Sequence, residues 1–165
     1  MGTIRGRLTV LRPAEERDVD LLTGWHADPE ISRYWDDETF TAEQVRERLA
    51  RSEVDPWVIE AGGAPVGYLQ SWWQRGVEPR RGGLDGFLVP CARGRGLMPD
   101  AARALAEALL ADGWLSVTVD PYAWNERAMR AWANAGFVEV ARHPADEEHT
   151  DEWVLMRFDP AAWAT

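Results

Sequence analysis

The chain has 165 residues, 45% of them hydrophobic and 28% charged, with a net charge of −10 at pH 7. This length suits a single domain over residues 1–165, and the negative charge argues against nucleic acid or anionic membranes as partners. No apolar run approaches the roughly 20 residues of a membrane span, and the first ten residues lack a signal-peptide core, so we expect a cytoplasmic protein.

Taken in order, the chain alternates strand and helix patterns. Thr41 and Gln44 match a capping box at the start of a helix, and Gly62-Gly63 matches a tight hairpin turn. The predicted elements are a strand at 8–12, helices at 18–27 and 41–51, strands at 57–61, 65–74 and 84–89, a helix after Gly96 to about 111, a strand at 115–119, a helix at 125–135, and strands at 137–141 and 152–158. This order predicts an α/β (α+β) domain whose mixed sheet has an early antiparallel hairpin and a later parallel pair.

The stretch 84–110 carries the clearest functional signal. A short apolar strand containing Asp85 breaks at Pro90, and a basic glycine-rich turn, Arg93-Gly94-Arg95-Gly96, leads into a long helix. Glycines let backbone N–H groups approach a ligand, and a helix start adds partial positive charge. The sequence therefore predicts a phosphate-binding turn.

Two motifs carry a resemblance to a known family. The run Arg93-Gly94-Arg95-Gly96-Leu97-Met98 resembles the acyl-CoA pyrophosphate loop of the GCN5-related N-acetyltransferase (GNAT) superfamily. Three further pieces of the chain resemble the second signature of that superfamily, namely Asp120-Pro121, Asn125-Glu126-Arg127-Ala128 and Ala135-Gly136-Phe137. The similarity extends from Leu11 to Phe158. The resemblance implies the GNAT fold, with a mixed sheet of about seven strands flanked by about four helices.

Within the superfamily the chain is most similar to the aminoglycoside 6'-N-acetyltransferases. The shared pieces are Tyr34-Trp35 followed by acids, Gly67-Tyr68-Leu69-Gln70-Ser71, Leu84-Asp85 and Val119-Asp120-Pro121. This similarity implies an enzyme that uses acetyl-CoA to acetylate the 6'-amine of aminoglycoside antibiotics and thereby gives resistance. Two alternatives remain: a GNAT enzyme acting on a protein N-terminus, a ribosomal protein or a siderophore precursor, and a non-catalytic acyl-CoA-binding module.

The resemblance also implies where coenzyme A lies, namely between strands 84–89 and 115–119, which splay apart at a bulge. A backbone N–H near Leu88 or Val89 is expected to hold the thioester carbonyl oxygen. Met98 replaces a small residue of the motif, so either its side chain points away from the pyrophosphate or the loop is slightly reshaped. The residues expected to contact coenzyme A are Phe87, Leu88, Val89, Arg93, Gly94, Arg95, Gly96, Leu97, Met98, Asn125, Ala128 and Trp132.

Asp85 is the candidate catalytic residue, because transfer of an acetyl group to an amine needs a carboxylate that accepts the ammonium proton. The alternative is that Asp85 is an acid that forms an ion pair or faces the edge of the sheet. Asp120 is expected to bind a second ammonium of the substrate, the alternative being a cap on the following turn. Only one of Trp72 and Trp73 should face the site, since neighbouring strand residues point oppositely. The expected substrate-binding residues are Trp35, Asp36, Asp37, Tyr68, Gln70, Trp72, Asp85 and Asp120.

Other reactive side chains suggest no further chemistry. Trp132 stands where the family often has a tyrosine that protonates the departing thiolate, and indole is not an acid, so no general acid is assigned. The three histidines are scattered, so no metal site is predicted, and Cys91 is expected to be a buried small residue. The acidic loop residues Glu147, Glu148, Asp151 and Glu152 form either a further wall of the acceptor pocket or a solvated surface. The expected partners are a cationic small molecule and coenzyme A, with the protein a monomer or homodimer.

Overall fold

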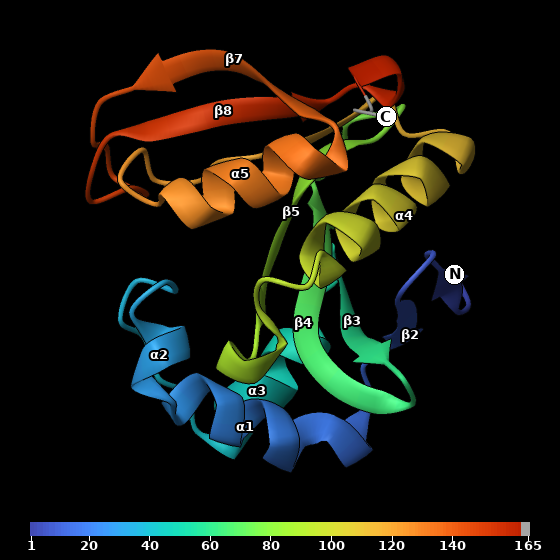
Figure 1. Cartoon of the computed structure of the whole chain (residues 1–165), viewed down its shortest axis with the longest axis vertical. Helices are drawn as coiled ribbons and strands as arrows, with labels where there is room; N and C mark the ends of the chain where they lie inside the picture. Colours follow the sequence, from blue (N-terminus) through green and yellow to red (C-terminus); the bar gives the residue numbers. More distant parts are fainter. Residues whose placement is uncertain (163–165) are drawn as a thin grey trace.

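In the computed structural model, which describes residues 1–162, one eight-stranded sheet runs through the molecule in the order β1-β2-β3-β4-β5-β6-β8-β7 (Figure 1). The strands are β1 (Ile4–Arg5), β2 (Val10–Pro13), β3 (Val54–Ala61), β4 (Ala64–Trp73), β5 (Arg81–Leu88), β6 (Ser116–Val119), β7 (Phe137–His143) and β8 (Trp153–Phe158). The α-helices are α1 (Val19–Ala27), α2 (Pro29–Ser32), α3 (Ala42–Leu49), α4 (Leu97–Ala111) and α5 (Glu126–Ala135). None of these helices is long and apolar enough to cross a membrane.

The sheet opens between β5 and β6, its one parallel pair of neighbouring strands. These strands pair only over three positions, from Arg81 opposite Ser116 to Gly83 opposite Thr118. β6 then ends at Val119, just before Asp120-Pro121, while β5 continues to Leu88 along β4. The separated pair confirms the predicted splay, but the predicted bulge is wrong, because the β4–β5 ladder is regular throughout. The strands part because β6 is short and a proline follows it.

Residue alternation gives the two faces of β4 and β5 different partners. Leu69 and Leu84 lie on the face that packs against α4. Tyr68 and Phe87 lie on the opposite face, against the apolar residues of α1 to α3. Gln70 pairs with Asp85 on the same face as Tyr68 and Phe87, since strand residues two apart share a face. The two-residue alternation along β4 and β5 therefore brings several predicted site residues to one face of the sheet.

Element boundaries differ from the prediction mainly where glycine or proline hides a strand. β3 begins three residues early, across Pro56, and β5 begins at Arg81 rather than 84. Gly82 and Gly83 read as a loop in the sequence, but they are where β5 meets β6. A Cβ on Gly83 would lie 2.6 Å from the Thr118 carbonyl oxygen and 2.8 Å from the Trp72 indole. Close packing of backbone and ring requires glycine there.

Candidate active site

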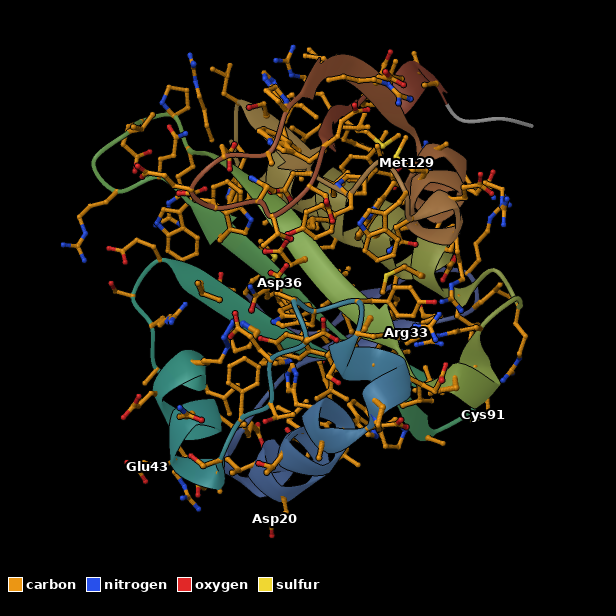
Figure 2. All side chains as sticks on the ribbon, turned by 90° about the vertical axis from the view of Figure 1, so that its left-hand side faces the viewer. Asp20, Arg33, Asp36, Glu43, Cys91 and Met129 are labelled. Carbon is orange, nitrogen blue, oxygen red and sulfur yellow. The ribbon has the colours of Figure 1, made fainter. Side chains whose placement is uncertain are left out.

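A cavity of about 690 Å³ lies on the face of β4 and β5 that carries Gln70 and Asp85. Figure 2 turns this side to the viewer and shows Asp36 near its middle, above α1. Of the four acids expected to form a further wall, Glu148 lines the cavity, and the neighbouring His149 lines it as well. Of the residues predicted to bind substrate, the cavity is lined by Trp35, Asp36, Gln70, Trp72, Asp85 and Asp120.

Two of the predicted substrate-binding residues lie outside this lining. Asp37 is exposed in a turn with φ 55°, and its carboxylate is not part of the wall. Tyr68 is only 4% exposed and lies behind the wall, where its hydroxyl donates to Gln70 Oε1 at 2.9 Å. The alternation of Trp72 and Trp73 is confirmed, because Trp72 lines the cavity while Trp73 packs on Trp114.

A second cavity of about 420 Å³ follows β5 past the end of β6 to the start of α4. Of the residues predicted to contact coenzyme A, it is lined by Phe87, Leu88, Arg93, Gly94, Gly96, Leu97, Met98, Asn125, Ala128 and Trp132. Arg95 is exposed outside the lining. Val89 also lies outside it, and its N–H donates to the Val66 carbonyl at 2.9 Å. The prediction of the Val89 N–H as an oxyanion donor is therefore wrong. Backbone N–H groups point alternately to the two sides of an antiparallel strand, so the Leu88 N–H points to the open edge of β5.

The two cavities adjoin. Tyr34, Gly86, Asn125, Ala128 and Trp132 line both of them. Gly86 lies on β5 beyond its last pairing with β6, so the shared wall falls at the splay. A molecule in the second cavity and one in the first therefore meet beside β5.

The start of α4 suits an anion. Gly96 caps this 15-residue helix with φ 74°, a left-handed conformation that favours glycine. Arg93, Arg127 and Arg130 also line the second cavity. Arg93 is held in place because its Nη2 donates to the Glu30 carbonyl at 2.6 Å. Backbone N–H groups at a helix start, together with guanidinium groups, are a typical phosphate environment.

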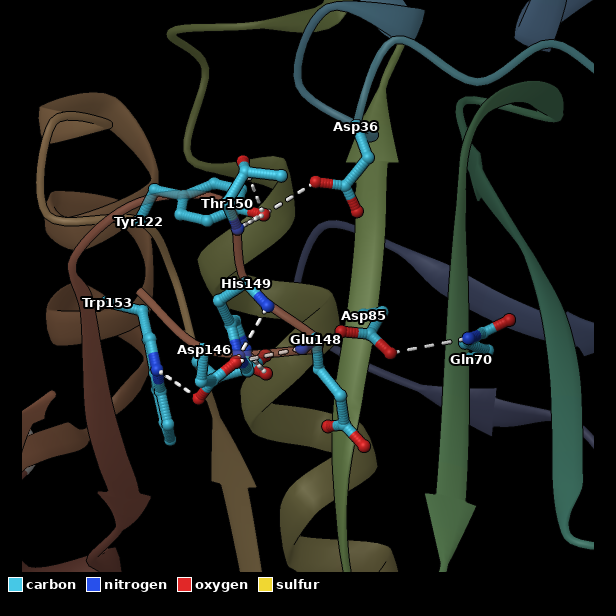
Figure 3. Close-up of polar contacts among 10 residues, drawn as sticks. Asp36, Gln70, Asp85, Tyr122, Asp146, Glu148, His149, Thr150 and Trp153 are labelled. Carbon is cyan, nitrogen blue, oxygen red and sulfur yellow. Dashed lines mark hydrogen bonds and ion pairs between the residues drawn. The ribbon is translucent and has the colours of Figure 1, made fainter. Parts of the chain in front are cut away.

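Asp85 has the electrostatics of a base that works near neutral pH. Burial, together with the negative charge of Asp120, raises its pKa to about 7, while a hydrogen bond from Gln70 opposes the shift. Gln70 Nε2 donates to Asp85 Oδ2 at 3.3 Å (Figure 3). The Tyr68 hydroxyl fixes the Gln70 amide by donating to its Oε1. Arg48, from α3, lines the same cavity and also lowers the pKa of Asp85.

Comparison with known proteins assigns the chain to a family. A model described as an acetyltransferase (GNAT) domain matches residues 14–144, which is most of the chain. The chain belongs to the GNAT acetyltransferase family. The architecture described above is the GNAT fold, with a two-residue β1 and a one-turn α2 beyond the predicted elements.

Named relatives of this GNAT acetyltransferase narrow the comparison. Proteins from Klebsiella pneumoniae and Serratia marcescens named aminoglycoside N(6')-acetyltransferase type 1 are 32% identical to it over an alignment of 145 residues. The matches cover 77% of this chain and 72% of each relative. A solved structure of AAC(6')-Ib in complex with paromomycin and acetyl-CoA is 28% identical, with a TM-score of 0.80 and coverage of 94% of this chain and 95% of that one. Another, with coenzyme A and kanamycin, has a TM-score of 0.79 at 28% identity, and covers 93% and 96%.

Arg48, Tyr122 and His149 are among the residues of the first cavity that the sequence did not predict. The Tyr122 hydroxyl donates to Asp36 Oδ1 at 2.6 Å and so joins the C-terminal half to the segment after α2 (Figure 3). The Arg48 guanidinium lies 4.3 Å from the centre of the Phe40 ring. An arginine on an amphipathic helix and a tyrosine after a strand carry no distinctive sequence signal.

Asp120 has a partner that the sequence did not predict. His149 Nε2 lies 2.7 Å from Asp120 Oδ2, and Asn125, not Asp120, caps the start of α5 by accepting from the Ala128 N–H at 3.2 Å. Cys91 is exposed, so the prediction of a buried thiol is wrong as well.

Proposed function

We propose that the protein is an aminoglycoside 6'-N-acetyltransferase that transfers the acetyl group of acetyl-CoA to the 6'-amine of the antibiotic. The observation that carries the proposal is the junction of the two cavities beside Asp85, at the point where β5 leaves β6. The similarity to named aminoglycoside N(6')-acetyltransferases supports this substrate class. Since acetyl-CoA is a cytoplasmic metabolite, we propose that the protein acts in the cytoplasm.

The second cavity fits coenzyme A. The pyrophosphate is expected to accept hydrogen bonds from N–H groups at Gly96, with Arg93 and Arg127 supplying charge. The free edge of β5 offers backbone groups to the pantetheine amides, as an added strand would take them. When bound, acetyl-CoA supplies an activated acyl group as a thioester.

The first cavity fits a polycationic sugar. Its carboxylates are supplied by Asp36, Glu38, Asp85, Asp120 and Glu148, and its aromatic walls include Trp35 and Trp72. Carboxylates pair with ammonium groups, and aromatic faces attract cations. The exposed Asp37 is not needed for this role.

Asp85 is assigned the proton transfer. A bound ammonium must lose a proton before its nitrogen can attack the thioester carbonyl, and a base is most effective when its pKa lies near the working pH. The pKa of Asp85, raised to about 7 by burial, meets that condition. The Leu88 N–H is positioned along β5 to polarise the carbonyl oxygen. No acid is assigned to the leaving thiolate, because Trp132 cannot donate a proton to it as a tyrosine would.

The test is release of free thiol from acetyl-CoA with two aminoglycosides that differ only in a 6'-amine or a 6'-hydroxyl. The proposal predicts rapid thiol release with the amine and little with the hydroxyl. Equal rates with both would contradict 6'-transfer, and turnover only with a peptide N-terminus or a siderophore precursor would favour another GNAT acceptor. Tight coenzyme A binding without thiol release from any amine would indicate a non-catalytic binding module.

A further inference from the structure

His149 occupies an unusual place in the acceptor cavity. Its Nδ1 lies 2.9 Å from Asp146 Oδ1 (Figure 3). Its Nε2 lies 2.7 Å from Asp120 Oδ2, so each ring nitrogen meets a carboxylate. The side chain is 12% exposed and stacks on Trp153 at 4.2 Å with an interplanar angle of 13°. The ring is therefore held on three sides.

This ring has the hydrogen-bonding pattern of an imidazolium. A neutral imidazole carries a single N–H, so it can donate to only one of two carboxylates, whereas the protonated ring donates to both. Asp146 is itself fixed, because it accepts from the Glu148 N–H, the His149 N–H and the Trp153 indole N–H. A protonated His149 ring satisfies both contacts and sets a positive charge against Asp120.

Asp120 is the carboxylate that would otherwise bind a second ammonium of the acceptor. With His149 in place, an internal cation already occupies one of its oxygens. We propose that His149 is a specificity-determining residue of the acceptor site, an internal substitute for an ammonium group that a polycationic acceptor must displace from Asp120. This inference rests on the proposed function and adds to it a competition for one carboxylate.

The competition depends on pH through the groups that surround the ring. Asp120 follows β6, Asp146 and Glu148 belong to the acidic loop (residues 146–151), and the Tyr122 ring meets the His149 ring edge to face at 6.1 Å. Asp85 and Asp36, from the facing side of the cavity, add negative charge nearby. Burial lowers the pKa of His149, but the hydrogen bonds that the ring donates to Asp120 and Asp146, with the negative charge of both carboxylates, outweigh burial and leave the pKa raised. Above that pKa the ring loses its charge, and Asp120 becomes available to the acceptor.

The experiment compares His149→Asn with wild type on two acceptors. Asparagine places its amide near the position of Nδ1, so it can keep the bond to Asp146 while leaving Asp120 free. The acceptors are kanamycin, which has several amines, and methyl 6-amino-6-deoxyglucoside, which has one. The KM for kanamycin is expected to fall about tenfold in the variant, the value of one charge-assisted hydrogen bond, with a smaller change for the monoamine.

His143→Asn is the matched control. His143 stacks on Trp153 at 4.4 Å but lies outside the cavity lining, so its loss should leave the ratio of the two KM values unchanged. In wild type this ratio should also change with pH, favouring kanamycin as pH rises, and in His149→Asn the change should disappear. Thermal unfolding of each variant identifies any loss of folded protein.

An unchanged KM ratio and pH dependence in His149→Asn would overturn the inference. A rise in both KM values by the same factor would also overturn it, since it would assign His149 a purely structural role. These results are distinct from failure of the proposed function, in which neither acceptor would cause thiol release in wild type. A ring titration by NMR gives a second readout: bound kanamycin should lower the pKa of His149, and an unchanged titration would contradict displacement.

Discussion

Replacement of Asp85 by asparagine tests the catalytic assignment, because it removes the base while keeping the size and shape of the side chain. Gln70 can keep a hydrogen bond to the new amide oxygen, so the wall of the cavity should be preserved. General-base catalysis contributes about 10²- to 10⁴-fold, and kcat/KM for a 6'-amino acceptor should fall by that factor. The dissociation constant of coenzyme A should remain within about twofold, since Asp85 lines only the first cavity.

The pH dependence of kcat/KM gives a second test of Asp85 as the base. Since burial raises the pKa of Asp85 to about 7, the base is half ionised at that pH. The wild-type kcat/KM should rise about tenfold per pH unit below pH 7 and become constant about one unit above it. The asparagine variant has no carboxylate to ionise, so this acidic limb should be absent from its profile.

The same substitution should stabilise the protein at alkaline pH. The pKa of Asp85 is about 7 in the folded chain and near 3.8 in the unfolded chain, so unfolding releases its proton between these values and stability falls as pH rises through that range. At pH 8 the penalty is at most about 4 kcal/mol, because each pKa unit corresponds to about 1.4 kcal/mol. Asp85→Asn should therefore unfold at a higher temperature than wild type at pH 8 and at nearly the same temperature near pH 4.

Asp37→Asn is the control for loss of one negative charge, because Asp37 is exposed outside both cavities. Thiol release measured over a range of pH, together with calorimetric unfolding, follows both variants. If Asp85→Asn kept more than a tenth of the wild-type kcat/KM with its acidic limb intact, Asp85 would not be the base. A lower unfolding temperature at pH 8 would show that the buried carboxylate stabilises the fold, against the reasoning above.

Three further substitutions test other parts of the site. Gly96→Ala places a Cβ at φ 74°, so coenzyme A binding by calorimetry should weaken about tenfold; unchanged affinity would argue against a role for this turn. Arg48→Met removes a positive charge that lowers the pKa of Asp85, so the acidic limb of the pH profile should move to higher pH, and a profile that stays in place would refute the coupling. Tyr122→Phe breaks the bond to Asp36, so the KM for the acceptor should rise about tenfold at constant coenzyme A affinity; an equal loss of both affinities would indicate general damage instead.

The sequence was most informative where a residue pattern has one structural meaning. Gly96, which precedes a long helical pattern, predicted the start of α4, and the capping box of Thr41 and Gln44 is formed as expected. The alternation of side chains along β4 predicted that Trp72 and Trp73 point to opposite faces. These features depend on neighbours in the chain, so the local sequence determines them.

Features that depend on distant contacts were not predictable in this way. His149 meets Asp120 across 29 positions, and Tyr122 meets Asp36 across 86, so neither pair leaves a local pattern. Tyr68 was expected in the pocket wall because an aromatic ring suits it, but the ring packs among α1 to α3. Its hydroxyl reaches the site only through Gln70. Burial of a ring and the partner of a charge are decided by tertiary packing.

The position of the transferred acetyl group tests the central claim most directly. Kanamycin incubated with the protein and acetyl-CoA labelled with ¹³C at the carbonyl would give a product whose new amide can be located by NMR. A single amide on the 6'-nitrogen, absent when Asp85 is replaced by asparagine, is the predicted result. Acetylation at another nitrogen, or no labelled amide while coenzyme A binds normally, would contradict the account.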